Sequence, residues 1–86
     1  MKRYENLIEM LNNEGYIVNQ FQEANESPYF TLNSEDGVFY FTVTQETDYL
    51  EIIVEVFDRE LQDYRTVENR KYKQAKAAFN FLQKLL

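Results

Sequence analysis

Residues 38–57 read VFYFTVTQETDYLEIIVEVF and contain two segments in which apolar and more polar side chains alternate. Successive side chains of a β-strand point to opposite faces of the sheet, so a period of two predicts a strand with one face toward the core. We therefore predict strands over residues 38–44 and 49–57, joined by a turn at residues 45–48. The side chains expected to face the core include Phe39, Phe41, Val43, Ile52, Val54 and Val56.

A helix is expected before this hairpin, over residues 3–14. Its apolar face has the spacing i, i+3, i+4 and i+7 and consists of Tyr4, Leu7, Ile8 and Leu11. Gly15 follows at the position where a left-handed residue commonly ends a helix. Aromatic and β-branched residues then predict strands over residues 16–22 and 29–32, and Gly37 is placed for the positive φ of a hairpin turn.

The segment after the hairpin ends in a second predicted helix, over residues 69–86. Its apolar stripe consists of Tyr72, Ala75, Phe79, Leu82 and Leu86, widened by Ala78 and Leu85. Residues 58–63 are polar and predict a loop. Residues 64–67 fit either an extension of the hairpin or a lead into the helix, and this alternative stays open.

These elements predict one α+β domain over residues 1–86. An N-terminal helix, a four-stranded antiparallel β-meander and a C-terminal helix follow one another, with both helices on one sheet face. The other sheet face would meet water or a partner. At 86 residues the chain has room for a single hydrophobic core.

The composition removes most catalytic and metal chemistry. The chain has neither Cys nor His, so thiolate nucleophiles, His bases and the usual zinc ligands are missing. Glu51 and Glu55 lie four residues apart on one strand, about 13 Å at the strand rise, which is too far for paired-carboxylate catalysis. We expect no enzyme activity, no cofactor and no metal site. The lack of Cys and of a long apolar run favours a cytoplasmic protein without a membrane segment.

Charge is distributed unevenly along the chain, whose formal net charge is −6. Twelve acids and no base lie between Tyr4 and Asp58, whereas residues 69–86 hold five bases and no acid. The two parts could simply compensate each other in the fold. Alternatively, the acidic part could dock a protein partner with a basic surface. Nucleic-acid binding by a basic C-terminal helix is disfavoured by the net charge. That helix would present Arg70, Lys71, Lys73 and Lys76.

The docking hypothesis selects residues of the open sheet face and of the turn before the last strand. They are Tyr40, Glu46, Asp48, Glu51 and Glu55. Tyrosine provides rigid apolar area with a polar tip and is enriched at interfaces, so Tyr40 is the expected anchor. The competing explanation is that Tyr and Thr are good strand residues on a half-solvated sheet.

In size and composition the whole chain is similar to many phage or mobile-element inhibitors, such as anti-CRISPR and other nucleic-acid-mimicking proteins. This similarity involves no residue pattern and assigns no site residues. The sequence therefore predicts a small acidic protein-binding module, an inhibitor of a basic, nucleic-acid-binding protein. The alternatives are a structural protein that forms a homodimer through its sheet, or a domain with weak nucleic-acid binding by the C-terminal helix.

Overall fold

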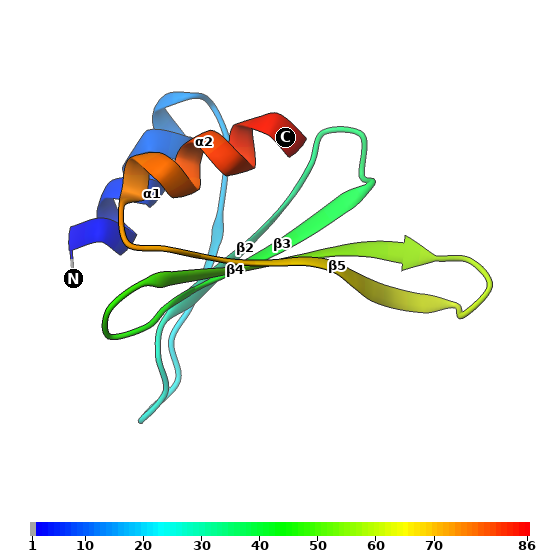
Figure 1. The fold of residues 1–86 in the computed structure, drawn as a ribbon, viewed down its shortest axis with the longest axis horizontal. Coiled ribbons are helices and arrows are strands. Elements are labelled where there is room, and N and C mark those ends of the chain that lie inside the picture. The colour runs from blue at the N-terminus through cyan, green and yellow to red at the C-terminus, as the bar shows by residue number, and fades with distance from the viewer. Residues whose placement is uncertain (1) are drawn as a thin grey trace.

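The computed structural model describes residues 2–86, in which two helices pack on one face of a five-stranded antiparallel sheet (Figure 1). The strands follow one another across the sheet in chain order, so the sheet is a meander. In chain order the elements are α1 (Lys2–Asn13), β1 (Asn19–Phe21), β2 (Tyr29–Asn33), β3 (Phe39–Gln45), β4 (Leu50–Asp58), β5 (Asp63–Tyr72) and α2 (Ala75–Leu85). The α+β class and the antiparallel meander are confirmed.

The core lies between the helices and the central strands. Cross-strand register places Phe30 beside Val43 and Val43 beside Ile52, and all three side chains are fully buried. The helices cover this face with side chains at helical spacing, namely Tyr4, Leu7, Ile8 and Leu11 of α1 and Ala75, Ala78, Phe79 and Leu82 of α2. The alternation of β3 and β4 therefore records which face is buried.

The two glycines end α1 and close the β2–β3 turn, as predicted. Gly15 has a φ of +90°, and the N–H groups of Gly15 and Tyr16 donate to carbonyl oxygens in the last turn of α1. Gly37 has a φ of +75° in the turn between β2 and β3. Both positions use a left-handed backbone conformation that costs glycine little.

The prediction of four strands was wrong, because residues 63–72 form a fifth strand. The predicted helix over residues 69–86 begins only at Ala75, and its first residues are the end of β5. Tyr72 does pack against the helix, with its ring centroid 5.8 Å from that of Phe81, but it does so from the sheet. The bases assigned to one helix are therefore divided among β5, the following connection and α2.

The hairpin of β4 and β5 extends beyond both helices (Figure 1). Its register shifts where Val54 pairs with Glu68 and Glu55 pairs with Thr66, which leaves Val67 as an extra residue on β5. Such a β-bulge bends the strand and increases its twist. The part of the hairpin beyond the bulge therefore leaves the layer that the helices cover.

Truncation of two phenylalanines should separate the core from the projecting hairpin. Phe41 is fully buried in β3, so Phe41→Ala should lower the free energy of unfolding by about 3–5 kcal/mol, as expected for a phenylalanine cavity. Phe57 is 49% exposed, so the matched Phe57→Ala should cost about 1 kcal/mol or less. Urea unfolding followed by circular dichroism measures both. Equal losses would contradict this assignment of the core.

Candidate functional site

The sheet face opposite the helices carries the second set of alternating side chains, and we call it the open face. Across β3 and β4, Tyr40 lies opposite Glu55, Thr42 opposite Ile53, and Thr44 opposite Glu51. Tyr40, Glu51 and Glu55 are each only partly buried. The open face therefore mixes rings, hydroxyls, an isoleucine and carboxylates.

Three rings gather on the open face where the hairpin leaves the rest of the sheet. Tyr64 of β5 lies with its ring centroid 5.7 Å from that of Tyr40 and 5.4 Å from that of Phe57, the latter in an edge-on arrangement. Phe57 and Tyr64 are direct cross-strand partners, and each is 49% exposed. We call Tyr40, Phe57 and Tyr64 the aromatic cluster.

The structure brings together two of the five residues selected from the sequence. Tyr40 and Glu55 are cross-strand partners beside the aromatic cluster. Glu51 lies four residues before Glu55 on β4 and is opposite Lys71 of β5. The ammonium group of that lysine lies 5.3 Å from the centroid of the Tyr49 ring.

The other two selected residues lie apart from the open face. Glu46 and Asp48 belong to the turn between β3 and β4, where the N–H of Glu46 donates to the carbonyl oxygen of Tyr49. The guanidinium of Arg3, from α1, donates to the carbonyl oxygen of Thr47 in this turn at 3.5 Å. Of the four selected acids, only Glu51 and Glu55 therefore lie on the open face.

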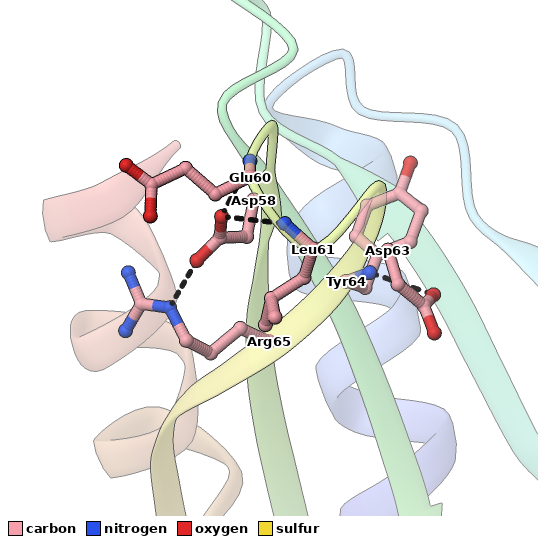
Figure 2. Close-up of polar contacts among 6 residues, drawn as sticks. All are labelled: Asp58, Glu60, Leu61, Asp63, Tyr64 and Arg65. Carbon is pink, nitrogen blue, oxygen red and sulfur yellow. Dashed lines mark hydrogen bonds and ion pairs between the residues drawn. The ribbon is translucent and has the colours of Figure 1, made fainter.

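The turn of the hairpin is organised around Asp58, as Figure 2 shows. Its Oδ1 accepts the N–H groups of Glu60 at 2.9 Å and Leu61 at 3.2 Å, and its Oδ2 accepts Nε of Arg65 at 3.2 Å. The hydrogen bond from the Leu61 N–H, supported by those from Glu60 and Arg65, holds the pKa of Asp58 below its ordinary value. The ionised carboxylate therefore fixes the turn that follows Phe57.

Sequence reasoning missed Tyr64 and Leu61 as surface residues. The sequence of residues 64–67 fits either a strand or a connection, so it does not place Tyr64 beside Phe57. Both flank a polar segment bounded by Asp58 and Asp63, which are themselves cross-strand partners. An aromatic residue on each side of such a segment is the signal that could have identified the pair. Leu61, at the tip, is 64% exposed.

Within residues 2–86, no group of three or more acids is placed to hold a metal ion, and neither helix is long and apolar enough to cross a membrane. Comparison of the chain with family models, curated proteins and solved structures finds no match. Function is therefore inferred from the residues of this chain alone.

Protonation of Asp58 should loosen the hairpin turn. Its pKa is lowered by folding, so its contribution is fully present above the unfolded pKa of about 4 and is lost as the pH falls through the lower folded value. We expect nuclear Overhauser contacts between the Phe57 and Tyr64 rings to weaken as the pH falls through the folded pKa of Asp58. Asp58→Ala should weaken them at pH 7, whereas Glu60→Ala, which removes the same charge from the same turn, should not. Equal effects of the two variants would refute the role of Asp58.

Proposed function

We propose that this chain is a protein-binding module that docks a partner with a basic surface through its open face, at the aromatic cluster and Glu55. In the finer form of the proposal, the partner is a nucleic-acid-binding protein and the module inhibits it by occupying its basic groove. The carboxylates then stand where the partner would otherwise bind phosphates.

The exposure of the aromatic cluster is the observation that carries this proposal. Phe57 and Tyr64 bury little area against the core, and the hairpin that bears them extends beyond the helices (Figure 1). Leu61 adds a further exposed apolar side chain at the tip. Large apolar side chains grouped on a surface commonly mark an interaction site, and Tyr and Phe are enriched at interfaces.

The charges around the cluster favour a basic partner. Residues 55–68 contain five carboxylates against two arginines. Glu55 lies beside the cluster on the open face, opposite Tyr40 and two residues before Phe57 on β4. Complementary charge speeds association and discriminates between partners, and its effect is screened by salt. Binding should therefore weaken as salt is raised.

Self-association is the second candidate, because β5 is an open edge strand. Its residues at and beyond the bulge are exposed, including Val67 at 39% and Tyr64 at 49%. An edge strand of ten residues presents unpaired backbone groups that a second copy could pair. The charges of Arg65, Glu68, Arg70 and Lys71 oppose this, since charged side chains commonly protect such edges.

Affinity capture with matched variants tests the proposal. The immobilised chain is exposed to lysate, washed at low and then high salt, and the retained proteins are identified by mass spectrometry. Tyr64→Ala and Glu55→Lys should each reduce capture of a basic partner about tenfold or more, the effect expected for a central interface residue. Ile17→Ala and Glu14→Lys are the controls, because both side chains are exposed away from the open face.

The outcome decides between the candidates. Salt-sensitive capture of a basic protein, lost with Tyr64→Ala and kept with Ile17→Ala, supports the proposal. Capture that all four variants retain would place the interface elsewhere. If only the bait is recovered, and sedimentation shows a dimer that Tyr64→Ala converts to a monomer, self-association is the function of this surface.

A further inference from the structure

A basic cleft lies at the end of the molecule where both helices begin. It is an open cavity of about 440 Å³ whose polar lining comes from Lys2, Arg3, Asn6, Lys73, Gln74 and Lys76. The first three residues belong to the start of α1, and the others to the β5–α2 connection and the start of α2. Figure 1 shows these two parts of the chain at the same end of the fold.

Four cationic residues line this cleft on a molecule with a net charge of −6. No carboxylate is among its lining residues. Within residues 2–86, no ion pair joins Lys2, Arg3, Lys73 or Lys76 to a carboxylate. Like charges gathered in one cavity repel one another, so an anion that binds there would relieve an unfavourable interaction.

The first turn of α2 adds backbone donors to the same cleft. Its N-cap residue, Gln74, makes no side-chain capping hydrogen bond, and the turn contains no acid. The first N–H groups of a helix have no partner within the helix and attract anions. Gln74 and Ala75 line the cavity together with Lys73 and Lys76, so the start of α2 and these two cationic residues border the same space.

The contacts that the four cationic residues already make leave their positive charges available to bind an anion. Arg3 donates one N–H to the carbonyl oxygen of Thr47, at the long distance of 3.5 Å. Lys76 lies with its ammonium group 5.3 Å from the centroid of the Phe79 ring, a contact that keeps the positive charge. Guanidinium and ammonium groups together suit phosphate, which accepts several charge-assisted hydrogen bonds at once.

We propose that the basic cleft binds a compact phosphate-bearing ligand, such as the diphosphate group of a small molecule. The cavity volume is in the range of small-ligand sites. A long polyanion is disfavoured because the chain beyond the cleft is strongly acidic. This site is independent of the open face and of the function proposed for it.

Titration with inorganic pyrophosphate, followed by the backbone amide resonances, tests the site. Binding should shift the amides of residues 2–6 and 73–77 and should weaken as salt is raised. Lys73→Gln/Lys76→Gln should raise Kd about tenfold or more, because it removes two charge-assisted contacts. Lys2→Gln/Arg3→Gln should do the same from the other helix.

The control variant is Arg59→Gln/Lys84→Gln. Like either cleft variant, it removes two positive charges from the net −6 and gives −8. Its Kd should change less than about twofold, since both side chains lie outside the cleft. All the substituted side chains are exposed except that of Arg3, which is partly buried, so circular dichroism should confirm an unchanged fold.

Three results would overturn the proposal. The first is an absence of amide shifts with pyrophosphate, and the second is an equal loss of affinity in the control variant. The third is an oligonucleotide that binds more than about tenfold tighter than pyrophosphate and shifts amides as far as Lys71 on the open face. A nucleoside diphosphate that binds more tightly than pyrophosphate supports the site and identifies a nucleotide as its ligand. Equal affinities for the nucleoside diphosphate and pyrophosphate also support the site, and show that it recognises the phosphate groups alone.

Discussion

Burial of one face of β3 and β4 under the two helices is the interaction on which the rest of the structure depends. Phe41, Val43, Ile52 and Val54 are fully buried there, while their sequence neighbours face the other way. Both helices lie on the same face of this sheet (Figure 1). The same constraint that stabilises the fold therefore leaves a second face open, with half of the strand side chains on it.

The open face and the hairpin are the places where the chain departs from what stability alone would select. A β-bulge beyond Val54 directs the hairpin away from the helices, and the ionised carboxylate of Asp58 holds its turn. Exposed rings on such an extension gain little from the core. At the opposite end, the starts of α1 and α2 gather cations on an otherwise acidic molecule. The fold thus presents two chemically distinct surfaces, one aromatic and acidic and the other basic.

The parts of the fold that could be predicted are those whose burial differs between faces. The apolar stripe of α1 and the alternation of β3 and β4 record that difference. Strand β5 could not be predicted, because an edge strand exposed on most of its length has no such alternation, and Tyr72 happens to precede Ala75 at helical spacing. The period of two in β3 and β4 puts Tyr40 and Glu55 on the same sheet face, where the structure makes them cross-strand partners. The basic cleft joins residues about 70 positions apart, which only the tertiary fold reveals.

The central claim is that the core lies on one face of the sheet and that the rest of the fold does not cover the β4–β5 hairpin. Hydrogen exchange of the backbone amides along the whole chain tests this most directly. Amides in β3 and in β4 before the bulge should exchange only through global unfolding, with protection that follows the free energy measured in urea. Amides beyond the bulge, in residues 56–66, should exchange through local opening at a much lower free energy. Equal protection in both regions would mean that another surface already covers the hairpin, and would contradict this account.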